Sequence, residues 1–592
     1  MGEDCSIAAD GRKQCRRVLE SATMWDASPS SRPWLREYPS GMPAEVDVPP
    51  VPVPHLLDET AARLPRRTAY IFYGRRLAYR QVRNLVDRFA AGLQTLGVRP
   101  GDRVSLVLPN CPQMAIVFFA VLRLGAVAVP HNPLYTAEEM GRQLADCGSR
   151  VAVVLDRSYA TVRSVRHSVP LEHVVVTSLT EYLPWPQRLA LRLPLASMRR
   201  KRAALTAEVP PDPGVIGFGE LLRRSRQPAR QTWLVPDRHP AAIQYTGGTE
   251  GRPKGVTLTH RNLVANAYQK QTWDLESRDG REVTLAVLPL FHSFGMTACL
   301  IAPVVRAETV VLLPRYDAGQ VIRALRRYRP TIFPGVPTLY EQVLDTPGVE
   351  RRDLASVRLW LSGASSLTAR TIERFHRMGL RGLVQAYGLT EASPAVSSNP
   401  GDGRARNETV GLPLPSTDVV IVDVDDPTRV LPPGRPGEVV VRGPQVFAGY
   451  WNRPEETARV LSNGWLRTGD IGVMSPDGFL TILDRKQDLI KVSGFSVYPS
   501  EVEEVLYRHP AVIECAVVGV PDERRGEKVV ACVVEHPAYP FSADELRRHC
   551  EKYLSHYKVP EEFLPRSALP RSGIGKVMRR VLREECLLEV TH

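Results

Sequence analysis

Several features that would set the fold or the location of this 592-residue chain are scarce in its sequence. Its nine cysteines lie far apart, with no CxxC pair and no CxxC…HxxxH spacing, so the sequence predicts neither a disulfide framework nor a zinc site. The most apolar helix-like stretch, residues 114–122, stops at Arg123, well short of the roughly 20 apolar residues of a membrane-spanning helix. No signal-peptide pattern precedes it. We therefore expect a cytoplasmic protein, with any membrane contact peripheral and on the inner face.

The composition is that of a globular protein with an excess of positive charge. Hydrophobic residues make up 43% and charged residues 24%, which excludes a disordered or collagen-like chain. Lysine and arginine number 77 against 64 acidic residues, a formal charge of +13. This excess favours phosphate-rich ligands or anionic surfaces as partners, and the sign of the charge alone does not choose between them.

Blocks of different periodicity follow one another along the chain. Residues 1–50 mix charge, Ser and Pro, which is the composition of a mobile leader. Over 53–180 and 240–400, helical patterns alternate with apolar strand-like runs, which indicates βαβ units and parallel sheets. Short strands and turn signals over 408–485 predict a small β-barrel-like part, and an α+β pattern follows residue 490. The predicted class is α/β, with a separate small α+β domain at the C-terminal end.

Between the two α/β halves lies a basic insert, residues 182–202, rich in Leu and Pro and ending in four cations. Apolar residues followed by cations can lie on an anionic membrane. The leucines of this insert fall on opposite sides of a helical wheel, however, and Pro194 interrupts the pattern. This arrangement favours a basic surface loop packed on its own domain, with peripheral membrane contact as the alternative.

A glycine-rich loop follows the apolar run at 241–244. Its sequence, YTGGTEGRPKG at 245–255, combines glycines that let backbone N–H groups approach an anion, two threonine hydroxyls and one lysine. These groups suit phosphate oxygens. A Walker A loop would have Ser or Thr after the lysine, whereas Gly255 stands there, so a GTPase-type or kinase-type site is disfavoured. From this loop alone, a glycine-rich turn without a ligand is the alternative.

Seven motifs in a fixed order resemble those of the adenylate-forming superfamily, which includes acyl-CoA synthetases, firefly luciferase and peptide-synthetase adenylation domains. The resemblance covers about residues 53–585. The motifs are YTGGTEGRPKG (245–255), LPLFH (288–292), YGLTE (387–391), GE to GYW (437–451), WLRTGD (465–470), DRKQD with KVSG (484–494) and PRSGIGK (570–576). Each motif alone is weak evidence, whereas the complete series in order is specific.

The resemblance implies an N-terminal AMP-binding domain at 51–485, a hinge at 486–488 and a mobile C-terminal domain at 489–592. It also implies a two-step reaction. ATP first converts a carboxylate, which has no usable leaving group, to an acyl adenylate with release of pyrophosphate. A thiol then takes the acyl group and AMP leaves. ATP, Mg²⁺ and coenzyme A are therefore the expected cofactor and co-substrates.

The resemblance also assigns the nucleotide to particular residues. Those expected to hold the phosphates are Thr246, Gly247, Gly248, Thr249, Gly251, Lys254 and Thr390. Those expected around the adenosine are Gly363, Ala364, Ser365, Tyr387, Gly388, Asp470 and Arg485. Among these, Tyr387 would stack on adenine, and Asp470 would accept both ribose hydroxyls with Arg485 assisting. Glu391 would hold Mg²⁺, which takes hard oxygen ligands and few of them from protein.

Three further residues are expected to act on the reacting groups. His292 resembles the residue that closes on the substrate carboxylate, and a packed histidine is the alternative. Lys576 matches the lysine that bonds the carboxylate and the α-phosphate during adenylation, where aimed charge contributes most to catalysis. Lys491 matches the residue that a rotation of the small domain brings in for the thioester step. Two positions depart from the family: Gln487 at the hinge, where Asp or Lys is usual, and Glu250 in the phosphate loop, where Thr is common.

The acceptor and the acid follow from finer resemblances. CoA is favoured over a carrier-protein arm because residues 493–501 look like the acyl-CoA-synthetase form of this loop, and no carrier domain follows in the sequence. The phosphate loop and the insert at 182–202 are similar to those of bacterial long-chain fatty acid ligases. We predict a fatty acid–CoA ligase for medium-chain or long-chain acids. The alternatives are an acyl-AMP ligase that loads a carrier protein, an aromatic acid–CoA ligase, and a non-enzymatic basic protein; the intact motifs argue against the last, and no nucleic-acid partner is expected.

Overall fold

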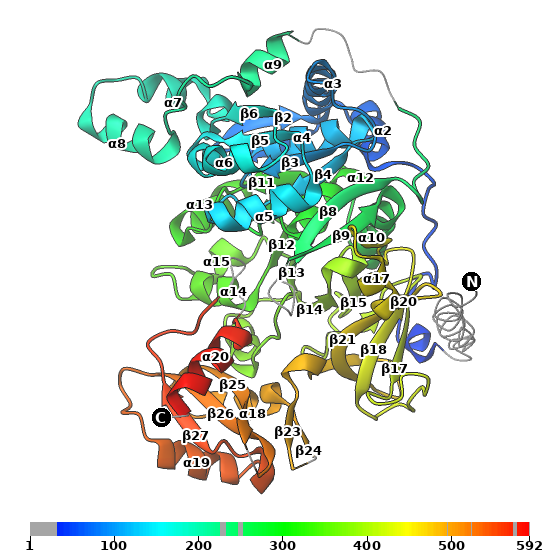
Figure 1. The fold of residues 1–592 in the computed structure, drawn as a ribbon, viewed down its shortest axis with the longest axis vertical. Coiled ribbons are helices and arrows are strands. Elements are labelled where there is room, and N and C mark those ends of the chain that lie inside the picture. The colour runs from blue at the N-terminus through cyan, green and yellow to red at the C-terminus, as the bar shows by residue number, and fades with distance from the viewer. Residues whose placement is uncertain are drawn as a thin grey trace, which may run out of the picture.

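The computed structural model describes residues 32–224, 232–246, 253–493, 495–522, 524–571 and 577–590. Two large sheets and their helices form the body of the molecule, a small antiparallel sheet lies beside them, and the C-terminal part forms a unit of its own (Figure 1). The predicted α/β class with a separate small C-terminal domain is confirmed.

The first large sheet has eight strands in the order β19-β9-β8-β4-β3-β5-β6-β7. They are β3 (Arg103–Val107), β4 (Val127–Pro130), β5 (Val151–Leu155), β6 (His173–Thr177), β7 (Val215–Gly217), β8 (Pro240–Thr246), β9 (Lys254–Thr259) and β19 (Gly449–Tyr450). Strands β8 to β7 run parallel, and β9 and β19 form an antiparallel edge. The central strands β4 and β5 are apolar throughout, and β3 is apolar apart from Arg103 and Ser105, because both faces of these strands are buried. The helices of this part are α3 (Tyr79–Thr95), α4 (Pro112–Arg123), α5 (Ala137–Cys147), α6 (Tyr159–Val165) and α9 (Phe218–Arg224).

The second large sheet has nine strands in the order β16-β15-β14-β13-β12-β10-β11-β1-β2. They are β1 (Thr68–Phe72), β2 (Arg75–Ala78), β10 (Val283–Ala286), β11 (Thr309–Leu312), β12 (Ile332–Gly335), β13 (Leu359–Ser362), β14 (Leu383–Gly388), β15 (Ala395–Ser398) and β16 (Leu412–Pro413). Strands β1 to β14 run parallel, with antiparallel strands at both edges. Its helices are α2 (Val53–Arg63), α10 (His260–Trp273), α11 (Ser293–Gly295), α12 (Ala302–Val305), α13 (Ala318–Tyr328), α14 (Pro337–Leu344), α15 (Arg351–Leu354) and α16 (Ala369–Arg377).

Two five-stranded sheets complete the fold. The antiparallel one comprises β17 (Asp418–Val422), β18 (Gly437–Arg442), β20 (Leu461–Ser462), β21 (Trp465–Met474) and β22 (Leu480–Arg485), with α17 (Pro454–Val460) beside it. The C-terminal one comprises β23 (Ile490–Val492), β24 (Phe495–Val497), β25 (Val512–Asp522), β26 (Gly526–Glu535) and β27 (Glu562–Pro565), with α18 (Pro499–Tyr507), α19 (Ala543–Glu551) and α20 (Arg579–Val590). Its apolar residues form cores of their own, as expected for a separate domain.

The second half of the expected leader is packed against the body of the protein, which corrects the prediction of a mobile segment over residues 1–50. Within residues 32–50, Trp34 is only 2% exposed. Its backbone lies so close to Gly478 that a Cβ atom there would come within 2.5 Å of the Trp34 nitrogen. The packing of this segment depends on contacts with residues far away in the sequence, so it cannot be predicted from the local sequence pattern. Residues 1–31 lie outside the described residues.

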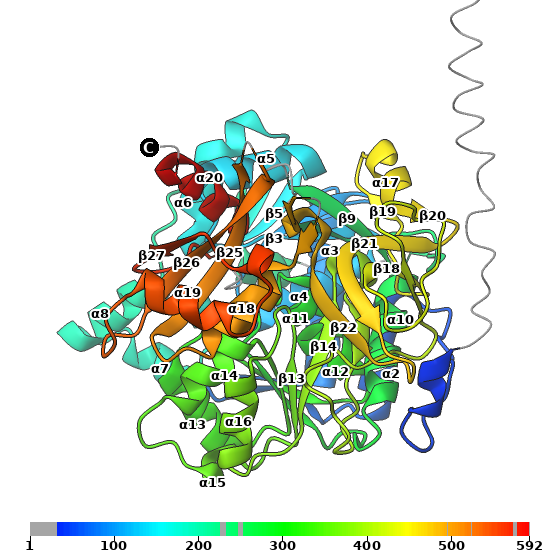
Figure 2. The same ribbon diagram turned by 90° about the horizontal axis from the view of Figure 1, so that it is seen from below.

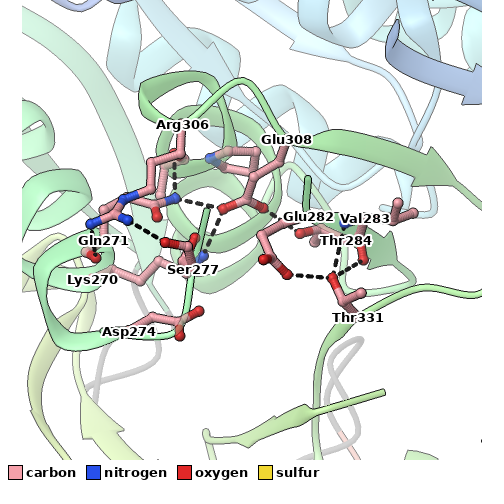
Figure 3. Close-up of polar contacts among 12 residues, drawn as sticks. Lys270, Gln271, Asp274, Ser277, Glu282, Val283, Thr284, Arg306, Glu308 and Thr331 are labelled. Atoms are coloured by element: carbon pink, nitrogen blue, oxygen red, sulfur yellow. Dashed lines mark hydrogen bonds and ion pairs between the residues drawn. The ribbon is translucent and has the colours of Figure 1, made fainter. Parts of the chain in front are cut away.

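A buried polar cluster fixes α10 to the nine-stranded sheet (Figure 3). The carboxylate of Glu308 is fully buried and accepts a hydrogen bond from Gln271 at 2.6 Å and another from Thr284 at 2.5 Å. Lys270 lies 3.5 Å from the same carboxylate. A buried charge is tolerated only when it is paired and hydrogen-bonded in this way. Because α10 directly follows β9, the cluster also fixes the strand that leaves the phosphate loop.

The basic insert forms two short helices, α7 (Trp185–Ala190) and α8 (Ala196–Leu205), where the sequence predicted a loop. They form a hairpin that projects from the side of the molecule (Figure 1). Pro194 lies in the link between them, so each helix has its own face and a single helical wheel over the whole insert is uninformative. Within the described residues, no helix is both long and apolar enough to cross a bilayer.

Candidate active site

A cavity of 1660 Å³ lies where the parallel strands of both large sheets end. Asn110 and Leu155 line it from the carboxyl ends of the eight-stranded sheet, and Leu288, Val336 and Ala364 line it from those of the nine-stranded sheet. Ligands of α/β proteins bind at this edge of the sheet because successive loops converge there. The volume exceeds the roughly 300–1,000 Å³ of ordinary small-molecule pockets.

Asn110 joins the two halves of the cavity wall. Its side-chain amide donates to the carbonyl oxygens of Ala286 at 3.2 Å and Leu288 at 2.9 Å, and its carbonyl accepts from the Leu290 N–H at 2.8 Å. The loop that leads to His292 is thereby fixed to the other sheet. The sequence analysis missed Asn110, because a single Asn after a strand carries no signal of so distant a partner.

The adenosine end of the expected site is built around the buried carboxylate of Asp470. Tyr387, at the end of β14, donates its hydroxyl to Asp470 Oδ2 at 2.5 Å. Arg485 lies opposite Asp470 in the β21–β22 ladder, and its Nε is 2.8 Å from Oδ1. The Asp470 charge raises the pKa of Arg485, and burial raises that of Tyr387 well above its usual value, so the phenol is neutral and donates. Three residues from two sheets thus form one hydrogen-bonded group.

The glycines expected along the base have steric reasons to be glycine. A Cβ at Gly388 would lie 2.1 Å from the carbonyl oxygen of Pro394, and one at Gly363 would lie 3.1 Å from the ring of Phe294. Ala364, the next residue, has a φ of 68°, a left-handed conformation that is uncommon for a residue with a side chain. Ser365 is exposed at the tip of the same loop. Backbone, not side chains, therefore forms this wall.

Thr390 and Glu391 lie in the 3₁₀ turn that follows β14. The hydroxyl of Thr390 is 3.1 Å from that of Ser293, the residue after His292. Glu391 accepts a hydrogen bond from the Tyr450 hydroxyl at 2.9 Å, and burial raises the pKa of its carboxyl group. Tyr450 belongs to a motif that the sequence analysis quoted without giving this residue a role.

The donor set around Glu391 fits a magnesium ion that is held mainly by its substrate. The described residues contain no group of three or more His, Cys, Asp or Glu side chains that could hold a metal ion without other ligands. A single half-buried carboxylate beside a hydroxyl is what Mg²⁺ requires when phosphate oxygens and water supply the remaining ligands. A bound cation would also offset the cost of a charged carboxylate in this partly desolvated place.

The phosphate loop is described only at its two ends. Thr246 and Lys254 lie opposite each other in the β8–β9 ladder, whereas Gly247, Gly248, Thr249 and Gly251 lie outside the described residues, as do Glu250 and Arg252. The Lys254 ammonium forms an ion pair with Glu456 of α17 and lies 5.5 Å from the centre of the Tyr450 ring. Lys254 is therefore close to the residue that contacts Glu391, as a shared phosphate site requires.

His292 lines the cavity. Its Nδ1 accepts a hydrogen bond from the backbone N–H of Phe294 at 3.3 Å, and burial lowers its pKa to about 4. The imidazole is therefore neutral at physiological pH. With Nδ1 occupied as an acceptor, the Nε2 hydrogen is available to a carboxylate oxygen.

The two expected catalytic lysines are not assembled with these groups. Lys491, on β23 of the small domain, is exposed, and its ammonium donates to Ser496 of the neighbouring strand at 2.9 Å. Lys576 lies outside the described residues. Where the small domain meets the large one, the Ser500 N–H donates to Asp484 Oδ2 at 2.9 Å, and Arg579 lies 3.7 Å from the same carboxylate.

Comparison with known proteins places the chain in a family. Residues 57–451 match the AMP-binding enzyme family, and residues 501–576 match the AMP-binding enzyme C-terminal domain. The fold is that of an α/β enzyme with a cavity at the carboxyl ends of its parallel strands. The chain belongs to the AMP-binding enzyme family, and the resemblance that its motifs indicated is confirmed.

Similar proteins span almost the whole chain. It is 37% identical over 557 residues to the long-chain-fatty-acid–CoA ligase of Bacillus subtilis, with 94% of this chain and 98% of that protein covered. It is 38% identical to the enzyme of the same name from Yersinia pestis, with 93% and 98% covered. Among solved structures it is similar to the anthranilate CoA ligase AuaEII in complex with anthranoyl-AMP, with a TM-score of 0.80, 28% identity and coverage of 92% and 99%. A Mycobacterium tuberculosis fatty acyl CoA synthetase gives a TM-score of 0.67 at 29% identity, with coverage of 91% and 99%.

Proposed function

We propose that this protein is an ATP-dependent long-chain fatty acid–CoA ligase. A fatty carboxylate attacks the α-phosphorus of ATP to give an acyl adenylate and pyrophosphate, and the CoA thiol then displaces AMP from the acyl carbon. The observation that carries the proposal is the 1660 Å³ cavity that extends from His292 into the hairpin, because a compact aromatic acid does not need such a volume. Relatives named as long-chain-fatty-acid–CoA ligases support it.

We assign the first step to His292 in the cavity and to the residues grouped around Asp470 and Glu391. Asp470 accepts the ribose hydroxyls while Tyr387 and Arg485 fix the direction of its two oxygens. The neutral His292 donates to the fatty carboxylate without pairing with it so strongly that its nucleophilicity is lost. Lys254 and Thr390 hold the leaving pyrophosphate. Mg²⁺ bound at Glu391 supplies positive charge against the phosphate oxygens.

The second step needs a different arrangement of the small domain. In the structure the Lys491 ammonium is paired within its own sheet, so it must be carried to the site by a movement of the domain. The boundary at 486–488 is a short 3₁₀ turn between β22 and β23, where a few dihedral angles can absorb such a rotation. Gln487 at its centre is uncharged, so no ion pair through this side chain opposes the movement.

A panel of acids tests the proposal. Purified protein is incubated with ATP, Mg²⁺ and CoA, and with octanoate, hexadecanoate, octadecenoate, benzoate or 4-coumarate, while AMP and acyl-CoA are measured. The proposal predicts the highest kcat/KM with the long-chain acids. A preference for the aromatic acids would favour an aromatic acid–CoA ligase. Release of pyrophosphate without transfer to CoA, but with transfer to a carrier protein, would favour an acyl-AMP ligase.

The outward face of the hairpin supports peripheral contact with an anionic membrane, and we include this contact in the proposal. Four large apolar side chains there are 48–75% exposed: Trp185, Leu189, Leu193 and Leu195. The cations of the same segment are Arg188, Arg192, Arg199, Arg200, Lys201 and Arg202. Exposed apolar side chains among cations are typical of a surface that lies in the headgroup region of a bilayer.

Vesicle co-sedimentation tests this contact. The triple variant Leu189→Ser, Leu193→Ser, Arg200→Glu is compared with Leu588→Ser, Arg580→Glu, which changes exposed residues of α20. The wild type and the α20 control should bind phosphatidylglycerol vesicles, the hairpin variant should bind less, and binding should weaken with salt, since each cation near the surface contributes about 1 kcal/mol. Equal binding of all three proteins at every salt concentration would exclude the hairpin as the contact.

A further inference from the structure

The hairpin has a second face that looks into the protein. Within residues 185–204 almost every side chain is exposed, and the three that are partly covered are Ala190, Leu191 and Met198. All three line the 1660 Å³ cavity, as does Leu205 at the end of α8. The spacing from residue 198 through 201 to 205 places the cavity-lining residues on one side of that helix.

Hydrogen bonds hold both helices of the hairpin over the cavity. On α7, the Gln187 side chain donates to the carbonyl oxygen of Tyr73 at 3.3 Å. On α8, the carbonyl oxygen of Ala204 accepts a hydrogen bond from the guanidinium of Arg157. Tyr73 and Arg157 themselves line the cavity. The hairpin is therefore attached to the rim at two points, one from each large sheet.

The hairpin lies at the far side of the cavity from the reacting groups. His292, which lines the cavity, directly precedes the short helix α11. Figure 2 shows α11 near the centre of the molecule and α7 and α8 at its periphery. An acyl chain whose carboxylate lies at His292 and which fills this cavity would therefore extend toward Leu191 and Met198.

We propose that the inner face of the hairpin, formed by Leu191, Met198 and Leu205, is the distal wall of the acyl site and determines which chain length the enzyme prefers. The inference rests on the proposed fatty acid ligase function. Each methylene group that leaves water raises the binding constant of the acid about fourfold. The distance from His292 to this wall therefore determines how many methylene groups of the chain can be buried. A chain too long for the wall must displace the hairpin or leave its end in water.

The test places one large side chain at each of two positions in the hairpin. Leu191→Trp fills the cavity, and Ser197→Trp adds the same group as the control at an exposed position of α8, outside both the cavity lining and the proposed membrane contact. kcat/KM for acid-dependent pyrophosphate release is measured with octanoate, decanoate, dodecanoate, tetradecanoate and hexadecanoate. Leu191→Trp should lower the ratio of hexadecanoate to octanoate activity about 16-fold or more, the value of two methylenes. Ser197→Trp should keep the wild-type ratio.

Met198→Ala provides an independent variant in the opposite direction, because it enlarges the far end and should move the optimum toward longer acids. The thermal transition and the octanoate activity show whether Leu191→Trp is folded. If it is not, Met198→Ala alone tests the inference. If Leu191→Trp and Met198→Ala both show the chain-length profile of the wild type and of Ser197→Trp, the inference is overturned while the ligase function stays intact. A wild type without activity on any fatty acid would instead overturn the proposed function, and that result needs no variant.

Discussion

Tyr387 and Asp470 are 83 residues apart in the chain and share a hydrogen bond of 2.5 Å from the phenol to the carboxylate. The bond joins the end of β14 in the nine-stranded sheet to β21 in the small antiparallel sheet. Because Arg485 engages the other carboxylate oxygen, the direction of Asp470 is fixed before any ligand arrives. A preformed acceptor loses less conformational entropy on binding a ribose.

Replacing Asp470 by Asn should raise the KM for ATP about 10-fold to 100-fold, because hydrogen bonds to a charged group contribute about 1.5–3 kcal/mol. The matched control is Asp477→Asn on the same small sheet, whose carboxylate pairs with Arg406 near the surface and lies outside the site. Initial rates over a range of ATP concentrations measure the effect. An unchanged KM for ATP in Asp470→Asn would remove this residue from the nucleotide site.

Glu391→Ala should abolish acid-dependent pyrophosphate release at limiting Mg²⁺ while the protein still folds, because the residue lies in a turn and not in the apolar core. Activity is titrated with Mg²⁺, and thermal unfolding is recorded in parallel. Glu408→Ala, at an exposed carboxylate, serves as the control and should behave as wild type. Full activity of Glu391→Ala at limiting Mg²⁺ would contradict the assignment of the metal to this residue.

The two lysines should separate the half-reactions. Lys576→Ala should slow acid-dependent pyrophosphate release roughly 10²–10³-fold, the typical loss for one preorganised donor. It should leave the conversion of supplied acyl adenylate and CoA nearly intact, and Lys491→Ala should do the reverse. Lys552→Ala, an exposed lysine at the end of α19, should change neither rate. If both variants slow both half-reactions equally, the lysines act from one arrangement and the domain does not alternate.

Two buried histidines should make the protein less stable in mild acid. Burial lowers the pKa of His131 to about 4 and that of His260 to about 3, against about 6.5 in the unfolded chain. Below pH 6.5 these two histidines bind protons in the unfolded state but stay neutral in the folded state. The free energy of unfolding should therefore fall between pH 6.5 and 4, by up to about 1.4 kcal/mol per pH unit for each histidine.

Urea unfolding at pH 7.0, 6.0, 5.0 and 4.5 measures this slope. His260→Asn retains a side-chain oxygen that can accept from the Val53 N–H, as His260 Nδ1 does at 3.2 Å, and removes one titrating group. Its pH dependence should be shallower than that of the wild type by the contribution of one histidine. Parallel slopes for the two proteins would show that the acid sensitivity arises elsewhere.

The regular elements could be predicted from the sequence because their signals are local. The apolar run predicted at Val151–Leu155 is β5, and the helix predicted to begin at Tyr79 is α3. A strand buried on both faces is apolar along its length, and a helix buried on one side has apolar residues at helical spacing. Both patterns are visible in the sequence of the element itself. Trp34 was missed for the opposite reason, since its burial depends on Gly478, more than 400 residues away.

The composition of the candidate site was predicted from ordered motifs, but its connections were not. The motifs named Tyr387, Asp470 and Glu391 separately, and nothing in them indicates that Asn110 joins the two sheets behind His292. The two faces of the hairpin were also hidden, because Leu191 and Leu193 are chemically identical and differ only in what the fold brings to each. Tertiary contacts of this kind have no local sequence signature.

The fate of the carboxylate oxygens tests the central claim most directly. Hexadecanoate labelled with ¹⁸O in both carboxyl oxygens is incubated with ATP, Mg²⁺, CoA and the protein, and the products are examined by mass spectrometry. Attack of the carboxylate on the α-phosphorus predicts one ¹⁸O in the phosphate of AMP, one in the thioester carbonyl and none in pyrophosphate. Label in inorganic phosphate with formation of ADP, or AMP without label, would contradict an acyl adenylate intermediate.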